Sequence, residues 1–177
     1  QIAHEFSNLS VLENLMMVPG NQSGEKIMTA LFKPGLVAQE EAVVKEKAKE
    51  VVEFLNLGHL SNELAGNLSG GQKKLLELGR TMMVDAKLVL LDEVGAGVNR
   101  TLLKDLGTAI EKLNKEKGYT FCMIEHDMDF ISRMCDPVIV MSEGSVLFEG
   151  TSEEVKKNER VIDSYLGRAN KKEREIN

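Results

Sequence analysis

One stretch of the sequence, residues 67–99, constrains the fold more than any other part. Near its start, Ser69-Gly70-Gly71-Gln72 opens an expected helix, whose glycines and positive N-terminal end allow backbone N–H groups to approach a ligand closely. Near its end, the apolar run Leu88-Val89-Leu90-Leu91 leads into adjacent carboxylates, Asp92 and Glu93. Such a run is typical of a buried parallel strand, and ligands of open α/β sheets bind at the carboxyl edge of these strands. The stretch therefore predicts phosphate binding at the helix start and acids at a sheet edge.

The order of the other expected elements predicts an α/β fold with an all-helical region ahead of its sheet. The main signals are helical spacing of apolar residues, capping hydroxyls at Ser10 and Thr151, and closing glycines at Gly58 and Gly118. Helices are expected to begin after the two hydroxyls and to cover residues 27–32, 40–57, 71–84, 101–117, 128–134 and 158–166. Strands are expected over residues 87–91, 119–124, 137–141 and 146–150, the last two forming a hairpin.

Composition excludes several classes of protein. The 177 residues are 42% hydrophobic and 28% charged, as in an ordinary globular protein, and no apolar run approaches the roughly 20 residues that span a bilayer. A net charge of −6 argues against a nucleic-acid partner, because such proteins usually carry a basic face. Two cysteines make neither a disulfide framework nor a metal site. Cys122 and Cys135 are therefore expected to be reduced, buried packing residues in a cytoplasmic protein.

Four motifs in a fixed order resemble those of ATP-binding cassette (ABC) ATPases. Leu68 with residues 69–72 resembles the signature motif, and residues 88–93 resemble the Walker B strand. Gly97-Val98-Asn99 is similar to the D-loop, and Ile124-Glu125-His126-Asp127 is similar to the strand end that carries the switch histidine. The resemblance implies an α/β P-loop NTPase fold with an α-helical subdomain. It assigns the Q-loop and helical subdomain to residues 1–84, the rest of the RecA-like core to 85–167, and a polar tail to 168–177.

One motif of that family does not occur in the sequence. There is no Gly-x-x-x-x-Gly-Lys-Ser/Thr phosphate loop, and the nearest match, residues 20–26, has the wrong spacing and is expected to be a surface loop. The first residue, Gln1, is not methionine. We therefore expect a chain truncated before the Q-loop, with the Walker A part upstream. Such a chain alone is expected to bind ATP very weakly and to hydrolyse none.

The resemblance also implies a role for each motif residue. Asp92 would hold Mg²⁺ directly or through water, Glu93 would polarise the attacking water, and His126 would sense the γ-phosphate of ATP. Gln1 would be the Q-loop glutamine at the magnesium site, with a frayed terminal residue as the alternative. The residues expected to act across a head-to-tail dimer are Ser69, Gly70, Gly71 and Gln72 of the signature and Gly97 and Asn99 of the D-loop.

Other stretches narrow the resemblance to ATP-binding subunits of branched-chain amino acid importers. They are residues 31–35, 96–99, 125–129 and 149–167. The resemblance implies a motor that couples ATP-driven dimer closure to movement of a permease, at the inner face of the cell membrane. Its implied partners are a second, identical or different, ABC ATPase subunit, permease subunits that contact the Q-loop region, and a substrate-binding protein. Phe6 and Leu9 would meet the permease in this arrangement, and packing into the local core is the alternative.

The residues leave other functions open. An ATPase for urea uptake or lipopolysaccharide export has similar motifs. A pseudo-ATPase or an interaction fragment without a nucleotide role agrees with the missing phosphate loop, although the intact Asp92, Glu93 and His126 argue against it. A DNA-repair or chromosome-structure ATPase would carry long coiled-coil heptads between the motifs, and the sequence has none.

Overall fold

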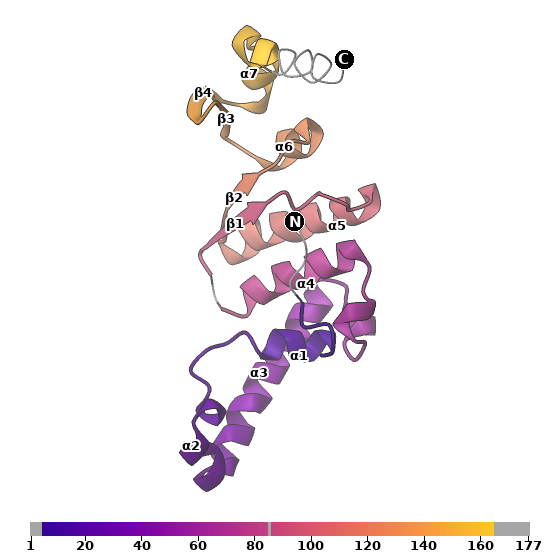
Figure 1. The fold of residues 1–177 in the computed structure, drawn as a ribbon, viewed down its shortest axis with the longest axis vertical. Helices are drawn as coiled ribbons and strands as arrows, with labels where there is room; N and C mark the ends of the chain where they lie inside the picture. The colour runs from indigo at the N-terminus through magenta and orange to yellow at the C-terminus, as the bar shows by residue number, and fades with distance from the viewer. Residues whose placement is uncertain (1–4, 85, 165–177) are drawn as a thin grey trace, which may run out of the picture. The chain divides into compact units, whose positions relative to one another are not determined.

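The computed structural model describes residues 5–84 and 86–164, so Gln1, His4 and the predicted tail lie outside it (Figure 1). The chain forms two compact units, residues 1–124 and 125–177. The first unit contains the helices α1 (Val11–Met16), α2 (Ile27–Phe32), α3 (Pro34–Phe54), α4 (Gly70–Met82) and α5 (Arg100–Lys117) and the strands β1 (Leu88–Asp92) and β2 (Thr120–Ile124). The second contains α6 (Met128–Met134), β3 (Val138–Ser142), β4 (Ser145–Gly150), α7 (Ser152–Lys157) and a helical segment over residues 159–164.

Helices α1, α3 and α4 share an apolar core in the first unit. Gly79 of α4 lies at the crossing, where an added Cβ would be only 2.8 Å from Leu55, 3.1 Å from Val51 and 3.2 Å from Leu15. All three of these side chains are buried. The α-helical region predicted ahead of the sheet is therefore confirmed as a packed layer, and its helices approach closely because one position has no side chain.

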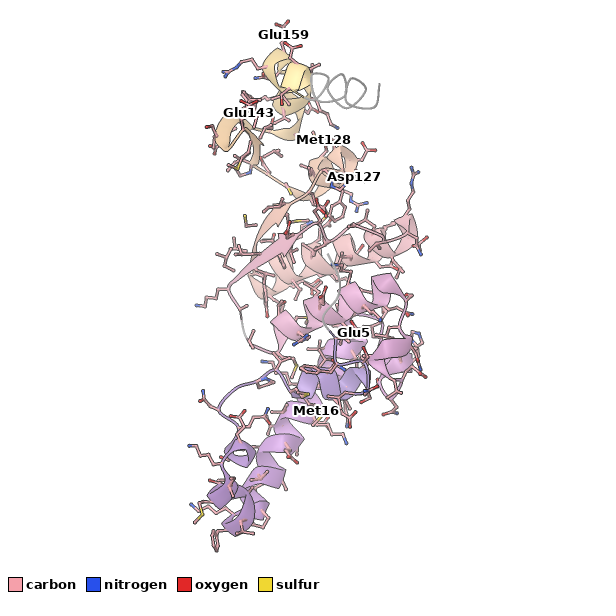
Figure 2. The ribbon with its side chains drawn as sticks, viewed as in Figure 1. Glu5, Met16, Asp127, Met128, Glu143 and Glu159 are labelled. Atoms are coloured by element: carbon pink, nitrogen blue, oxygen red, sulfur yellow. The ribbon has the colours of Figure 1, made fainter. Side chains whose placement is uncertain are left out.

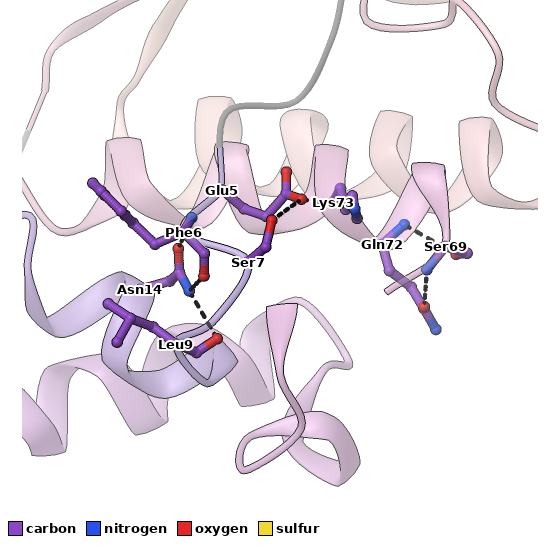
Figure 3. Close-up of polar contacts among 8 residues, drawn as sticks. All are labelled: Glu5, Phe6, Ser7, Leu9, Asn14, Ser69, Gln72 and Lys73. Carbon is purple, nitrogen blue, oxygen red and sulfur yellow. Dashed lines mark hydrogen bonds and ion pairs between the residues drawn. The ribbon is translucent and has the colours of Figure 1, made fainter. Parts of the chain in front are cut away.

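The segment before α1 is fixed by a buried asparagine (Figure 3). The predicted cap is present, because Ser10 and Glu13 form a capping box at the start of α1. Asn14, with no exposed surface, accepts a hydrogen bond from the Phe6 N–H at 2.9 Å and donates to the carbonyls of Phe6 at 3.1 Å and Ser10 at 2.9 Å. One buried amide side chain thus links the backbone of Phe6 to that of Ser10, and its own polar atoms are satisfied in the interior.

The boundaries predicted for the long helix were wrong at both ends. Helix α3 begins at Pro34 rather than at residue 40. A proline cannot continue a helix from its interior, but it is favoured at the first position of a new one, where its missing N–H is not needed. It ends at Phe54, and Gly58 is not its closing residue. Asn56 takes the left-handed conformation with φ +57°, and the Leu57 N–H donates to the Val52 carbonyl at 2.7 Å. These are the features of a Schellman motif with asparagine in the place of glycine.

Strands β1 and β2 pair in parallel, as predicted, from Leu88 opposite Thr120 to Asp92 opposite Ile124. The prediction that both faces are buried was wrong. Val89 is buried, but Leu90, Cys122 and Ile124 are exposed, so the expected burial of Cys122 is also corrected. The apolar pattern predicts that other elements pack against both faces of this two-stranded sheet. Within the described residues, only the face that carries Val89 is packed in this way.

The second unit is built around a β-hairpin and confirms the elements predicted there up to residue 164, after which the predicted last helix lies outside the described residues. Strands β3 and β4 are antiparallel, and Glu143 and Gly144 between them both have positive φ, as a type I′ turn requires (Figure 2). Thr151 caps α7 in a capping box with Glu154. Buried valines 138, 155 and 161 form a small core. Cys135 packs against it, as expected, but is half-buried rather than buried.

No helix among residues 5–84 and 86–164 combines the length and apolar character needed to cross a membrane. This agrees with the absence of a long apolar run in the sequence.

Replacing Asn14 by alanine tests the role of the buried amide. We expect Asn14→Ala to lower the free energy of unfolding by about 2–4 kcal/mol, because the hydrogen bonds of a fully buried side chain are lost and the space it filled is left empty. Urea denaturation followed by circular dichroism measures the change. Asn67→Ala is the control, since Asn67 is exposed and should change stability by less than about 1 kcal/mol. Equal effects of the two substitutions would contradict this assignment.

Candidate functional site

The signature segment forms a capped helix start (Figure 3). Ser69 is the N-cap of α4, and its backbone N–H donates to the Gln72 side-chain oxygen at 2.9 Å. In return the Gln72 N–H donates to the Ser69 Oγ at 3.4 Å. Ser69 and Gly70 are exposed, so an anion can approach this end of α4, where partial positive charge from the helix dipole is concentrated. Gln72, predicted to act on ATP, uses its side chain in this structure to fix the turn.

The two glycines of the signature differ in their surroundings. A Cβ on Gly70 would meet one atom within 4 Å, the Gly97 carbonyl oxygen at 4.0 Å. A Cβ on Gly71 would lie 2.9 Å from the Leu102 Cβ and would overlap the Leu102 Cδ1. Gly71 is buried and lets α4 pack directly against α5, a role that the sequence analysis did not anticipate. Gly70 therefore leaves space in which a ligand can approach the backbone. At Gly71, the packing of α4 against α5 requires glycine.

The predicted D-loop residues lie next to the signature. Gly97 is exposed and has φ +71°, a conformation that glycine adopts without strain. Asn99 is the N-cap of α5, and its Oδ1 accepts a hydrogen bond from the Leu102 N–H at 2.9 Å. Because Leu102 also contacts Gly71, the cap of α5 and the start of α4 belong to one packed block. The structure thus brings the predicted signature and D-loop residues together.

The adjacent carboxylates lie where β1 ends. Asp92 is the last residue of the strand and is exposed. Glu93 is half-buried, and its N–H donates to the Ile124 carbonyl at 2.9 Å, which extends the parallel ladder by one bond. The backbone of Glu93 has φ +45°, a costly conformation for a residue with a long side chain and one that concentrates at functional positions. The chain therefore turns away from the sheet at Glu93.

Two predicted site residues, His126 and Gln1, are not part of the described first unit. His126 belongs to the second unit, where it is exposed and stands directly before Asp127. Asp127 is the N-cap of α6, and its Oδ1 accepts from the N–H groups of Asp129 at 2.9 Å and Phe130 at 3.0 Å. Gln1 lies outside the described residues.

The sequence analysis did not anticipate an ion pair that lies beside the signature (Figure 3). Lys73, the residue after Gln72, places its Nζ 2.7 Å from the Glu5 Oε1. The Glu5 side chain is only 7% exposed, and its Oε2 is buried without a hydrogen-bond partner among the described atoms. The Lys73 hydrogen bond lowers the pKa of Glu5 below its ordinary value, although burial opposes the shift. No periodicity signals a pair that is 68 residues apart.

Phe6 and Leu9, for which a permease contact and local core packing were both considered, differ in their burial. Phe6 is half exposed and lies under the Arg80 guanidinium, 5.8 Å from the ring centroid, whereas Leu9 is partly buried. A guanidinium over an aromatic ring is a favourable contact, so Phe6 is held in place while part of its ring remains accessible.

A preassembled metal centre is absent from the described part of the chain, where no three histidine, cysteine or acidic side chains gather. The exposed carboxylate of Asp92 is nevertheless suited to Mg²⁺. This ion usually takes one or two protein carboxylates and completes its octahedral shell with water and phosphate oxygens.

Family comparisons match both ends of the chain. The model of the ABC transporter family matches residues 1–96, and that of the branched-chain amino acid ATP-binding cassette transporter matches residues 145–170. A probable branched-chain amino acid transport ATP-binding protein, LivG, from Archaeoglobus fulgidus is 42% identical over 167 residues. The alignment covers 94% of this chain and 63% of that protein. A protein of the same description from Methanocaldococcus jannaschii is 39% identical, with 94% and 65% covered.

Solved structures agree with these matches. A nucleotide-free ATP-binding cassette from an ABC transporter has a TM-score of 0.73 and 38% identity, over 90% of this chain and 63% of that one. The ADP conformation of an ATP-binding cassette has a TM-score of 0.71 and 36% identity, with 91% and 64% covered. The predicted fold class is confirmed. The chain spans a little under two thirds of the length of these relatives.

The contrast between the two signature glycines can be measured directly. We expect Gly71→Ala to lower the free energy of unfolding by about 1–2 kcal/mol, because overpacking against Leu102 outweighs the gain of up to about 1 kcal/mol in helix propensity. Gly70→Ala serves as the matched control and should be neutral or slightly stabilising. Urea denaturation of the two variants gives the comparison. If Gly71→Ala were as stable as Gly70→Ala, the packing role of Gly71 would be wrong.

The Glu5–Lys73 pair should make stability depend on pH. At pH 7 we expect Glu5→Gln to cost about 2 kcal/mol of unfolding free energy, because a charged hydrogen bond is lost. The folded-state pKa of Glu5 is lowered, so the contribution is present above pH 4.5, the ordinary glutamate value, and is lost as pH falls through the folded-state pKa. The stability difference between the two proteins, measured by denaturation between pH 3 and 7, should therefore shrink as the pH falls.

Glu46→Gln is the control for this pH series. Glu46 forms an ion pair of the same 2.7 Å length with Lys49, but both side chains are exposed, so the loss should stay within about 0.5 kcal/mol at every pH. A pH-independent effect of Glu5→Gln would show that Glu5 stabilises the fold by packing rather than by its charge.

Proposed function

Because the chain belongs to the ABC transporter family, we propose that it is part of the ATP-binding and ATP-hydrolysing subunit of an ABC importer, with branched-chain amino acids as the transported class. The observation that carries the proposal is the exposed N-terminal end of α4. It lies within the region that matches the family, and Gly97 of the D-loop is beside it. The match of residues 145–170 and the descriptions of the relatives support the choice of substrate class.

We assign phosphate binding to the start of α4. The Ser69 hydroxyl and the N–H groups of the first turn are donors at the positive end of a helix, as required for a terminal phosphate. Gly70 leaves room for close approach of that phosphate. In our proposal these groups act on ATP that a second ABC subunit holds, and Gly97 and Asn99 lie along the interface between the two subunits.

We assign the hydrolytic step to the carboxylates after β1 and to His126. Asp92 would hold Mg²⁺, which supplies neutralisation of phosphate charge. Glu93 would accept a proton from the attacking water, and its fixed backbone would limit the positions its carboxylate can take. His126 would orient the water and sense the terminal phosphate, and Gln1 would complete the magnesium site.

The remaining partners follow from the same assignment. We propose that the segment around Phe6, held by Asn14 and Glu5, faces a transmembrane permease, and that a substrate-binding protein delivers the amino acid. ATP-driven closure of two ABC subunits would then move the permease, and the subunit would work at the cytoplasmic face of the membrane.

The 177-residue chain alone is proposed to be inactive, because it has no phosphate loop. The exposed apolar face of Leu90 and Ile124 supports the view that additional sequence, of the kind that makes the relatives longer, covers β1 and β2 in the working protein. A chain extended upstream to include a phosphate loop is the natural comparison.

Calorimetric titration with Mg-ATP tests this proposal on both chains. We expect binding by the extended chain and none by the 177-residue chain. In the extended chain, Glu93→Gln should retain binding and reduce hydrolysis by about 10²–10⁴-fold, because only the proton acceptor is removed. Tight binding by the shorter chain would refute the need for a phosphate loop, and full hydrolysis by Glu93→Gln would refute the role of Glu93. If neither chain bound, a function without nucleotide would be favoured.

A further inference from the structure

Residues 5–9, which we call the anchoring segment, pair with the chain just before the signature motif. The Ala65 N–H donates to the Leu9 carbonyl at 2.9 Å, and the Gly66 N–H donates to the Ser7 carbonyl at 3.1 Å. A Cβ on Gly66 would lie only 2.9 Å from that same Ser7 oxygen, so the two stretches are in close backbone contact. The residues that lead into the signature are therefore held by the anchoring segment.

The anchoring segment also contacts α4, the helix that the signature begins. The Glu5 Oε1 lies 2.7 Å from the Lys73 Nζ, and both side chains are largely buried, with 7% and 23% of their surface exposed. The Phe6 ring lies under the Arg80 guanidinium, 5.8 Å from it. Because Lys73 and Arg80 are seven residues apart, they lie on the same side of α4, about two turns from each other. The anchoring segment thus holds the signature from both of its ends.

Lys73 links the anchoring segment to the signature serine (Figure 3). Its side chain binds Glu5, and its N–H donates to the Ser69 carbonyl at 2.9 Å, which closes the first turn of α4. This first turn has no acidic residue of its own. A lysine near the positive end of a helix is unfavourable unless its charge is balanced, and Glu5 balances it from outside the helix. Two short contacts therefore join Glu5 to the backbone of Ser69.

We propose that Glu5 is a positioning residue for the signature. By holding Lys73, it fixes the first turn of α4, and with it the Ser69 hydroxyl, in the place that a terminal phosphate requires. The inference rests on the proposed binding of phosphate at this helix start, and it adds to that site a residue outside the ABC motifs. Because Glu5 and Lys73 neutralise each other, they contribute geometry rather than net charge. Donors that are fixed before the ligand arrives bind it without having to be rearranged.

The ATP dependence of hydrolysis by the extended chain, which contains a phosphate loop, tests this inference. We expect Glu5→Gln and Lys73→Met each to raise the KM for ATP about fivefold and to change kcat by less than about twofold, because more ATP is needed to close two subunits whose signatures are displaced. Combining the two substitutions should raise KM no further than either does alone, since both remove the same contact. Lys73→Arg, which keeps the charge, should leave KM nearly unchanged.

The direction of the shifts separates positioning from a purely electrostatic role. If the pair acted only through its charges, Glu5→Gln would lower KM and Lys73→Met would raise it, because ATP is an anion. If the pair only stabilised the fold, both variants would contain less active protein, so the apparent kcat would fall and KM would not move. Either of these two results would overturn the proposal.

Glu46→Gln is the matched control, because its ion pair with Lys49 has the same 2.7 Å length but is exposed on α3. It should leave both kinetic constants unchanged, and circular dichroism verifies that each variant is folded. Should Glu5→Gln fail to fold, Lys73→Met alone decides, because Lys73 is the less buried partner. An unchanged KM in an active extended chain would overturn this inference alone. An unsubstituted extended chain that hydrolysed no ATP would overturn the proposed function and this inference together.

Discussion

The candidate site depends on the direct contact between α4 and α5 at Gly71 and Leu102. This contact sets two helix N-termini side by side, one capped by Ser69 and the other by Asn99. Two sequence motifs separated by more than twenty residues thereby become one exposed surface with the positive ends of both helices near it. Gly71, which has no side chain, allows the two helices to approach closely enough for this.

Much of the fold could be predicted because local signals were unambiguous. Ser10 and Thr151 precede acidic residues at capping-box spacing, and both cap the helices predicted after them. Gly118 ends α5 in the left-handed conformation that glycine favours. The apolar runs that end at Asp92 and Ile124 pair in parallel, as an alternation of strands and helices predicts. In each case the residue type and its position require the same local structure.

The errors arose where one residue type permits two structures or where contacts are long-range. Pro34 can end one helix or begin another, and Asn56 can replace glycine in a closing turn. Gly71 was assigned to ligand approach because its neighbour Leu102, 31 positions along the chain, carries no motif. The Glu5–Lys73 pair gives no periodic signal for the same reason. Burial of β1 and β2 was overestimated because a strand's sequence does not specify what covers it.

A double-mutant cycle on Gly71→Ala and Leu102→Ala tests the central claim most directly. Leu102→Ala removes the Cγ and Cδ1 atoms that a new Cβ on Gly71 would meet, while the Leu102 Cβ remains. We expect the two substitutions to be coupled by about 1 kcal/mol or more, with the double variant more stable than the sum of the single effects predicts. Additivity within about 0.5 kcal/mol would contradict the claim that this contact holds the signature and the D-loop together.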